Sequence, residues 1–378
     1  MPKIRILVVD DSVVVRRMVS DALGSDPQLE IAGTAANGKI ALAKIPQVNP
    51  DIVILDVEMP ELDGLGTLVE IRKSLPALPV IMYSTLTQRG AEATLDALSK
   101  GATDYVTKPS NVGSAAQGLE CIRTQLIPKI KAICVRVLGF AAPRSNLIPT
   151  VVSKAAPARL VPPRGAERID IVAIGVSTGG PNALALLMPV FPRDFPVPLV
   201  IVQHMPPVFT RLLAERLAAK SQIHVEEGFM GAILEPGCAW IAPGDYHMVV
   251  ANENRRVILR TYQGPPENSC RPAVDVLFRS VADVYRPHVL AVEMTGMGQD
   301  GLRGCELVRE LGGQVLAQDQ ASSVVWGMPG FVANAGLADK ILPLDQLGME
   351  IIRRVRVGRE ASREFISTQR TGDSSTLR

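Results

Sequence analysis

The chain has 378 residues, of which 47% are hydrophobic and 21% are charged. This composition is typical of globular proteins and excludes a disordered or collagen-like chain, and the length predicts two or three domains. Aromatic residues make up only 4% and the net charge is +2. The chain as a whole therefore offers neither base-stacking surfaces nor the positive charge that favours nucleic acids or membranes.

The N-terminal segment MPKIRILVVDDS has two acidic residues by position 11 and lacks the apolar core of a secretory signal. No run of 18 uncharged apolar residues occurs, so no membrane insertion is expected. The cysteines are odd in number and widely spaced, which argues against disulfides and a structural zinc site. We therefore expect a cytoplasmic protein with free thiols at Cys121, Cys134, Cys238, Cys270 and Cys305.

The charge is distributed unevenly along the chain. Residues 1–110 carry a net charge of about −3 and residues 169–350 about −6, whereas residues 111–168 carry about +7 and residues 351–378 about +4. The Pro-, Ala- and Arg-rich sequence within the +7 segment is typical of a semi-rigid linker. We expect a first domain at 1–125 that ends in a helix, a linker at 126–168, a second domain at 169–350 and a disordered tail at 351–378.

In the first domain, apolar β-rich runs alternate with helical patterns. Such alternation predicts a parallel sheet covered by helices on both faces, with ligands bound beyond the carboxyl ends of the strands. The expected strands are 4–9, 29–34, 51–55, 79–83 and 103–106, and helices are expected at 11–23, 64–73 and 88–100.

Polar side chains follow four of these strands, namely Asp10, Asp11, Asp56, Ser84 and Lys108. Three carboxylates at one sheet edge repel one another, and a hard divalent cation such as Mg²⁺ would relieve that repulsion. One carboxylate could then attack a phosphoryl donor, while the Lys and Ser side chains hold the phosphoryl oxygens. Solvated loop acids and a surface lysine are the alternative.

This half resembles a two-component receiver domain of CheY/flavodoxin-like fold. The matching segments are VVDDS at 8–12, LDVEMPELDG at 55–64, MYST at 82–85 and YVTKP at 105–109.

The resemblance implies that Asp56 is the phosphoacceptor and that Ser84 and Lys108 contact the phosphoryl group. It places Tyr105 at the position of the rotameric switch, although a half-buried aromatic at a strand end would look the same. It implies Mg²⁺ at the receiver, held by Asp10, Asp11, Asp56 and the Glu58 backbone.

The second domain begins with a strand at 169–175, followed by GVSTGGP and a helical pattern. The sequence at 175–179 satisfies G-x-S-x-G, which exposes a serine, Ser177, on a tight strand-to-helix turn. The following helix N-terminus offers backbone amides to an oxyanion. A glycine-rich phosphate loop or a plain tight turn fits the same pattern. The dinucleotide fingerprint fails because position 177 is not glycine.

A serine nucleophile needs a base. The chain has four histidines, and His204 follows the apolar strand in LVIVQH, at the carboxyl edge of a sheet. A later strand at 288–294 runs into TGMGQDG, where Asp300 could orient the imidazole. Each has a plain alternative, as a hydrogen-bonded strand-end histidine and a helix-capping aspartate. The chain order Ser, His, Asp differs from that of α/β-hydrolases. The other histidines are His224, His247 and His288.

This half is similar to the CheB-type protein-glutamate methylesterase domain over about 169–345, which implies a second, Rossmann-like parallel-sheet domain. The resemblance implies Ser177 as nucleophile, His204 as general base and acid, and Asp300 as its orienting carboxylate. The matching segments are IGVSTGGPNAL, IVQHMPP, WIAPGDYHM, CRPAVDVLF, TGMGQDG, AQDQASSVVWGMP and ILPL.

The same resemblance implies oxyanion donors from the backbone near Thr178 and Met297. The departures are small, with Val176 where Ala is common, Cys270 where some members have His, and Trp326 where Phe or Tyr is usual. The loop that holds Asn268 and Cys270 has no assigned role, and Trp240 and Trp326 are expected in the core or a pocket wall.

Together, the two resemblances imply a hydrolase, activated by phosphorylation, that demethylates glutamate methyl esters and deamidates glutamines for sensory adaptation. The implied partners are the cytoplasmic helices of methylated chemoreceptors and a CheA-type histidine kinase, with the chain acting as a cytoplasmic monomer recruited to receptor arrays. No cofactor is expected for the esterase reaction.

Two other function classes remain. A DNA-binding output is disfavoured because the second domain is acidic and shows no recognition-helix pattern. A docking adaptor with an inactive esterase fold is disfavoured by the presence of Ser177, His204 and Asp300.

Overall fold

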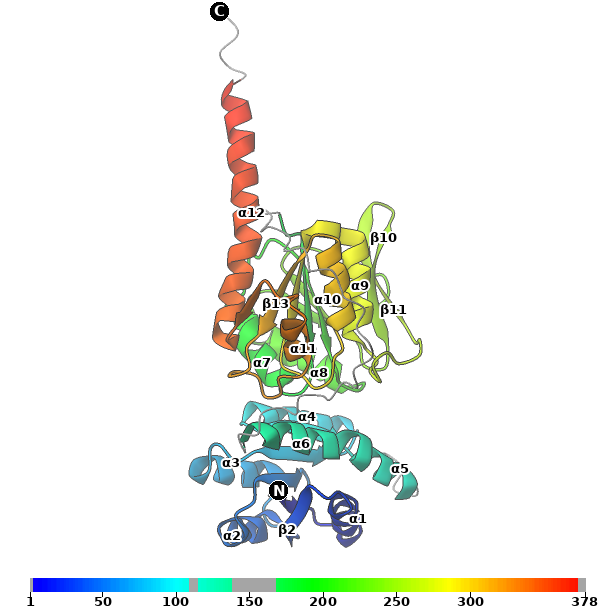
Figure 1. Cartoon of the computed structure of the whole chain (residues 1–378), viewed down its shortest axis with the longest axis vertical. Helices are drawn as coiled ribbons and strands as arrows, with labels where there is room; N and C mark the ends of the chain where they lie inside the picture. Colours follow the sequence, from blue (N-terminus) through cyan, green and yellow to red (C-terminus); the bar gives the residue numbers. More distant parts are fainter. Residues whose placement is uncertain (1–2, 109–114, 138–167, 373–378) are drawn as a thin grey trace, which may run out of the picture.

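The computed structural model describes residues 3–108, 115–137 and 168–372 (Figure 1). Two α/β domains pack against each other, and the last helix extends away from the second domain (Figure 1). The strands of both principal sheets are parallel, which confirms the predicted fold class of two doubly wound parallel-sheet domains.

The first domain has a five-stranded sheet in the order β2-β1-β3-β4-β5. Its central strand β3 is buried at every residue, as expected for a strand with helices on both faces. The elements are β1 (Ile4–Val9), α1 (Val13–Gly24), β2 (Leu29–Ala35), α2 (Gly38–Val48), β3 (Ile52–Asp56), α3 (Gly64–Ser74), β4 (Val80–Ser84), α4 (Gln88–Ser99), β5 (Asp104–Thr107), α5 (Ala115–Cys121), the π-helical turn η1 (Ile122–Leu126) and α6 (Ile127–Val137).

Side-chain caps start the helices of this domain. The Ser12 side chain accepts a hydrogen bond from Val15 N at the start of α1, and Asn37, Asp63 and Thr87 cap α2, α3 and α4 in the same way. Such caps satisfy backbone N–H groups that a helix leaves unpaired. They start α1, α3 and α4 close to the carboxyl ends of β1, β3 and β4, where the predicted phosphorylation residues lie.

The predicted linker begins too early. Residues 127–137 form α6, and Ile127, Ile130 and Ile133 are buried in the apolar core of the first domain. Their spacing of three places them on one helix face, which packs against the domain. The sequence predicted a helix at the end of this domain, but the boundary placed at residue 125 ends that helix too soon. The rest of the predicted linker, 138–167, lies outside the described residues.

The second domain has a seven-stranded parallel sheet in the order β14-β13-β12-β6-β7-β9-β8 and a separate antiparallel hairpin, β10-β11. Its elements are β6 (Ile171–Val176), α7 (Gly180–Leu187), η2 (Met188–Val190), β7 (Leu199–Gln203), α8 (Phe209–Ala218), β8 (His224–Glu227), β9 (Cys238–Ile241), β10 (His247–Glu253), β11 (Arg256–Tyr262), α9 (Val274–Tyr285), η3 (Arg286–His288), β12 (Val289–Glu293), α10 (Leu302–Glu310), β13 (Gln314–Gln318), α11 (Met328–Asn334), β14 (Lys340–Leu342) and α12 (Leu344–Gly372).

The predicted disordered tail is wrong through residue 372, because α12 runs from Leu344 to Gly372. Leu347, Ile351 and Val355 are buried in an apolar cluster that includes residues of both domains. Their spacing of four makes a stripe on one helix face, which the polar end of the tail concealed. Residues 373–378 lie outside the described part of the chain.

The two domains meet through β5 and α4 of the first and α7 and α8 of the second (Figure 1). The Tyr105 and Phe209 rings stack with centroids 4.9 Å apart and planes 5° from parallel. Arg216 of α8 pairs with Asp96 at 2.7 Å and also donates to a backbone carbonyl of α4. Asn182 of α7 donates to the Ala102 carbonyl at 3.1 Å, so the contact combines apolar and polar interactions.

We expect Ile130→Ala to lower the free energy of unfolding of the first domain by about 2–5 kcal/mol, because it opens a cavity at a fully buried site. Arg123→Ala, on an exposed position of the preceding turn, is the control and should change it by less than about 0.5 kcal/mol. Urea unfolding of both variants measures the difference. Equal free energies of unfolding for the two variants would mean that residues 126–137 do not pack into the first domain and belong to the linker.

Candidate active site and phosphorylation pocket

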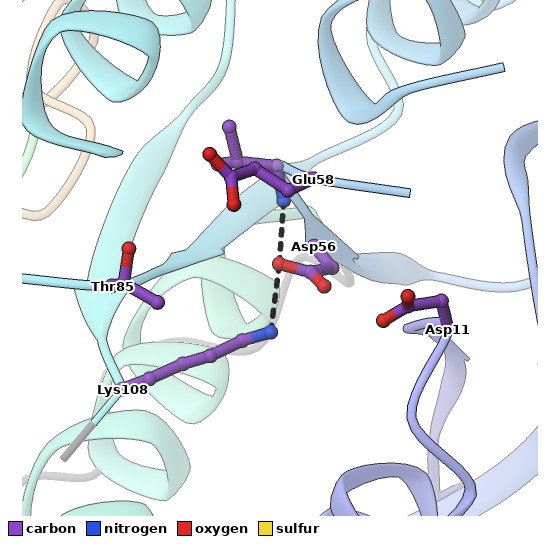
Figure 2. A pocket seen from close by; sticks show the side chains of 6 residues that line it. Asp11, Asp56, Glu58, Thr85 and Lys108 are labelled. Carbon is purple, nitrogen blue, oxygen red and sulfur yellow. Dashed lines mark hydrogen bonds and ion pairs between the residues drawn. The ribbon is translucent and has the colours of Figure 1, made fainter. Parts of the chain in front are cut away.

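An open pocket lies at the carboxyl edge of the first sheet. It is lined by Asp11, Asp56, Val57, Glu58, Thr85 and Lys108, and Figure 2 shows the carboxylates of Asp11 and Asp56 with the Lys108 amine beside Asp56. The sequence-predicted residues Asp11, Asp56, Glu58 and Lys108 are therefore brought together, and Asp10, which also pairs with Lys108, is 2% exposed.

Lys108 bridges two of the carboxylates, with Nζ 2.8 Å from Asp10 Oδ2 and 2.7 Å from Asp56 Oδ1. Burial raises the pKa of Asp56 to about 6, against the opposing effect of Lys108. Burial also disfavours the charged amine, but the two carboxylates outweigh it and raise the pKa of Lys108. Asp56 is thus a buried carboxylate at the mouth of a pocket, held as an anion by one lysine.

Carboxylate oxygens of Asp10, Asp11 and Asp56 lie within 4.8 Å of one another. Oxygen donors at this spacing fit a small hard cation such as Mg²⁺. Asp11 is exposed and can turn toward a cation, whereas Asp10 and Asp56 are fixed by burial and by Lys108. The Glu58 side chain pairs with Arg89 at 3.4 Å, and its backbone remains a predicted ligand.

Ser84 does not line the pocket in this structure. It is buried at the end of β4, and its hydroxyl donates to the Gly90 carbonyl at 3.1 Å. The next residue, Thr85, faces the pocket instead (Figure 2), and the sequence analysis missed it. A contact between Ser84 and a phosphoryl group stays a prediction. Tyr105 lies in the domain interface, 6% exposed and not half-buried.

At the second sheet, three neighbouring strands carry the predicted catalytic residues. Ser177 follows β6, His204 follows β7, and Asp300 lies in the loop after β12, where β12 and β7 flank β6. His204 N donates to the carbonyl of Val176 at 3.2 Å, which places the serine and the histidine side by side. Gly179, with φ of 77°, turns the chain from β6 into α7, as a tight strand-to-helix turn requires.

The imidazole of His204 is held by Asp300, with Nε2 2.8 Å from Oδ2. Asp300 is 2% exposed and also accepts backbone N–H groups of Val274, Asp275 and Gly301 at 2.7, 3.0 and 3.1 Å. Burial opposes its negative charge, but His204 and these donors hold the pKa of Asp300 below its usual value.

Burial also disfavours the charged imidazole, but hydrogen bonds to Asp300 and Cys270 outweigh it and raise the pKa of His204 to about 10. A ring with this pKa is mostly charged near pH 7, and its smaller neutral fraction, which is a strong proton acceptor, is the form that general base catalysis uses.

Ser177 is partly exposed and lies against Gly296, where an added Cβ would come within 2.9 Å of the serine Cβ. Within the described residues, no hydrogen bond joins its hydroxyl to His204, whose Nδ1 instead lies 3.6 Å from Cys270 Sγ. Ser177 and His204 thus lie at the ends of adjacent strands, and the hydrogen bond between their side chains is not formed in this structure. Thr178 is buried, Met297 of the loop after β12 packs against the apolar cluster that contains Val325, and their role as oxyanion donors stays a prediction.

Two residues of the loop at 264–272 belong to this site, although the sequence analysis gave them no role. Asn268 Nδ2 donates to Asp300 Oδ1 at 2.8 Å and to Asp275 Oδ2 at 2.9 Å, and Cys270 contacts His204. The signal in the sequence was an Asn and a Cys close together in an otherwise irregular loop. No local pattern connects that loop to Asp300, which lies 32 positions away from Asn268.

A further carboxyl, Glu293 at the end of β12, is fully buried. In the described part of the chain, neither of its oxygens has a hydrogen-bond partner. Burial raises its pKa well above the usual value, and the nearby charges of Asp300 and Asp275 act in the same direction. Its surroundings therefore favour the neutral form of Glu293, which lies against Gly175 and Gly301, where added Cβ atoms would come within 3 Å of its oxygens.

The remaining histidines are engaged elsewhere. His224 pairs with exposed Glu226, His247 contacts the Pro265 carbonyl and His288 contacts the Arg168 carbonyl. None of these partners belongs to the Ser177 site, which supports the choice of His204. The two tryptophans pack as expected, with Trp240 buried and Trp326 Nε1 donating to the Gln318 carbonyl. All five cysteines are free.

Comparisons with known proteins identify the families that the two domains resemble. A model of the response regulator receiver domain matches residues 6–119, and a model of the CheB methylesterase matches residues 172–351. The protein-glutamate methylesterase/protein-glutamine glutaminase of Trichodesmium erythraeum (strain IMS101) is 58% identical over 357 residues, covering 94% of this chain and 100% of the relative. The protein of the same name from Nocardioides sp. (strain ATCC BAA-499 / JS614) is 51% identical, covering 94% and 96%.

Among solved structures, the CheB methylesterase catalytic domain of Thermotoga maritima is 42% identical, covers 49% of this chain and 98% of its own, and has a TM-score of 0.48. In the part of the chain that the structure describes, no helix has both the length and the apolar character needed to cross a bilayer.

These findings show that the protein is a response regulator whose output domain is a hydrolase. The chain belongs to the CheB methylesterase family, and its relatives named above match 94% of its length.

We expect Glu293→Gln to stabilise the second domain more at pH 8 than at pH 5. Above the ordinary pKa of 4.5 the unfolded chain releases this proton while the folded chain keeps it, so wild-type stability falls as pH rises toward the raised pKa. The difference should grow by about 1.4 kcal/mol per pH unit within that window. Urea unfolding measures it, with exposed Glu235→Gln as the control. A difference independent of pH would mean that Glu293 is not held neutral.

Proposed function

We propose that the second domain hydrolyses glutamate γ-methyl esters on the cytoplasmic helices of chemoreceptors and deamidates glutamines there, so that the chain serves sensory adaptation. The observation that carries this proposal is the His204–Asp300 pair at 2.8 Å, placed next to Ser177 at the ends of adjacent strands. The names of the relatives support the substrate class. No group beyond the chain's own residues is needed for the ester chemistry.

In the proposed reaction, His204 Nδ1 accepts the Ser177 proton as the serine oxygen attacks the ester carbonyl carbon. Asp300 stabilises the charged ring, and backbone amides near Thr178 and Met297 would bind the oxyanion. The imidazolium then protonates the departing methoxide as methanol, and a water deprotonated by His204 releases the acyl group from Ser177. A glutamine substrate loses ammonia instead. General base catalysis of this kind contributes about 10²–10⁴-fold, and one oxyanion donor about 10²–10³-fold.

For the first domain we propose phosphorylation of Asp56 by the phosphohistidine of a CheA-type kinase. The Asp56 carboxylate attacks the phosphorus, and Lys108, now 2.7 Å from it, would hold a phosphoryl oxygen. Asp10, Asp11 and Asp56, with the Glu58 backbone, would hold Mg²⁺, which neutralises phosphoryl charge when bound. The pairing of Lys108 with both Asp10 and Asp56 means that phosphorylation must rearrange this contact.

We propose that the unphosphorylated first domain restricts access to Ser177 and that phosphorylation releases it. The support is the contact of β5 and α4 with α7 and α8 (Figure 1), because α7 begins three residues after Ser177 and α8 five residues after His204. A second support is Val325, which lies in the apolar cluster of the first domain together with Met297.

We expect Ser177→Ala to abolish methanol release from methylated receptor membranes while leaving the fold intact, because the attacking oxygen is removed. Gas-phase detection of methanol measures the rate, and exposed Ser99→Ala is the control. Release at the wild-type rate would remove Ser177 from the mechanism. Absence of release from the phosphorylated wild-type chain would instead favour an adaptor with an inactive esterase fold.

We expect Arg216→Ala to raise the basal rate of the unphosphorylated chain by about fivefold, corresponding to about 1 kcal/mol of lost domain contact. Arg211→Ala is the matched control, because Arg211 lies on the same helix and pairs with Glu215 within it. Deletion of residues 1–150 should raise the rate further. If neither Arg216→Ala nor the deletion raises the rate, the first domain does not inhibit the second.

A further inference from the structure

The site contains a nucleophilic side chain that the proposed reaction does not use. Cys270 Sγ lies 3.6 Å from His204 Nδ1, the nitrogen opposite the one that Asp300 holds. Thiol, imidazole and carboxylate therefore follow one another in the order that nucleophilic catalysis requires. The same base that faces Ser177 is within reach of a thiol.

The position of Cys270 is built into the fold. Its backbone forms two hydrogen bonds with the backbone of Glu267, with N–O distances of 2.8 and 3.1 Å. Both terminal nitrogens of Arg279 donate to the Glu267 carboxylate at 2.7 Å. Asn268, between them, is tied to Asp300. The loop that carries the thiol is thus anchored to the carboxylate that orients the base, so the thiol and the imidazole are held together.

A thiol releases its proton far more readily than a serine hydroxyl, and the thiolate is the reactive form toward electrophiles. The neutral form of His204 can accept that proton, and Asp300 stabilises the resulting imidazolium. The contact with Cys270 also contributes to the raised pKa of His204. Cys270 is partly exposed, so a small reagent can reach the sulfur.

The other thiols lack this arrangement. All five cysteines lie in the described part of the chain, and Cys270 is the only one with its sulfur recorded within hydrogen-bond reach of an imidazole. Burial raises the pKa of the other four, so that their thiolates are scarcer near neutral pH. Cys238 is the useful comparison because it is also partly exposed.

We propose that Cys270 is a modification site in which His204 activates the thiol toward hydrogen peroxide, and that the resulting sulfenic acid reversibly blocks the esterase. The inference rests on the proposed function for its inhibitory half. It requires a peroxide as oxidant and a small thiol as reductant.

In the oxidation, the Cys270 proton passes to His204 Nδ1 and the thiolate sulfur attacks one peroxide oxygen. The O–O bond breaks, an S–O bond forms, and the departing hydroxide takes the proton from the imidazolium and leaves as water. Sulfur loses two electrons and the peroxide gains them. The new oxygen lies next to Nδ1, where the Ser177 proton must be delivered. Two equivalents of a small thiol return the Cys270 thiol and yield a disulfide and water.

The test uses the full chain with a chelator present, so that metal-catalysed peroxide chemistry is suppressed. After brief peroxide treatment, sulfenic acid is trapped with dimedone and the rate of labelling at each cysteine is measured by peptide mass. We expect labelling of Cys270 on the order of tenfold faster than labelling of Cys238. His204→Gln should bring the two rates together, because the thiol loses its base.

Inhibition is measured in parallel as methanol release relative to the untreated sample of the same variant. Wild type and Cys238→Ser should lose activity with peroxide and regain it with dithiothreitol, whereas Cys270→Ala should keep the activity that it has before treatment. Equal labelling rates at Cys270 and Cys238, or equal inactivation of Cys270→Ala and wild type, would overturn the proposal. Absence of methanol release from untreated wild type refutes the proposed function and the inhibitory half, while the labelling rates still decide whether His204 activates the thiol.

Discussion

The buried carboxylate of Asp300 is the interaction around which the second domain is arranged. A carboxylate out of water is costly unless hydrogen bonds compensate for the lost hydration. Here the compensation comes from the first amides of α9, at Val274 and Asp275, from the loop amide of Gly301, and from Asn268. The start of α9 and the loops after β11 and β12 are therefore held in place by the charge of Asp300. The same carboxylate also orients the His204 ring, through Oδ2.

The neutral carboxyl of Glu293 lies close to that charge and is its counterpart. Asp300 accepts several N–H donors, which favour its ionised form, while Glu293 is buried and has no hydrogen-bond partner among the described residues, which favours its protonated form. The different fates of two nearby carboxyls follow from the supply of N–H groups, since desolvation acts on both. A protonated Glu293 adds no second negative charge to that of Asp300, and such a charge would further stabilise the charged imidazole and leave less of the neutral base.

In the first domain too, buried carboxylates at a sheet edge are stabilised by nearby donors. Parallel strands end together, so Asp10 and Asp56 are forced close, and Lys108 neutralises part of their repulsion. β5 and α4 also contact the second domain, where Tyr105 stacks on Phe209. Lys108, which pairs with Asp56, directly follows β5, the strand that carries Tyr105.

The sequence by itself determined the two parallel sheets, the convergence of Asp10, Asp11, Asp56 and Lys108, and the pairing of His204 with Asp300, because continuous apolar strands and strand-end polar residues are local patterns. It predicted a helix at the end of the first domain but ended that domain at residue 125, before α6. It did not reveal that residues 351–372 are helical, since their apolar face lies within a basic and polar segment whose averaged composition conceals a stripe of one residue in four. Only the tertiary structure decided that Thr85 faces the pocket in place of Ser84, and that Asn268 and Cys270 reach the catalytic pair. Those contacts join segments far apart in the chain, and packing of whole elements, which no local pattern records, brings them together.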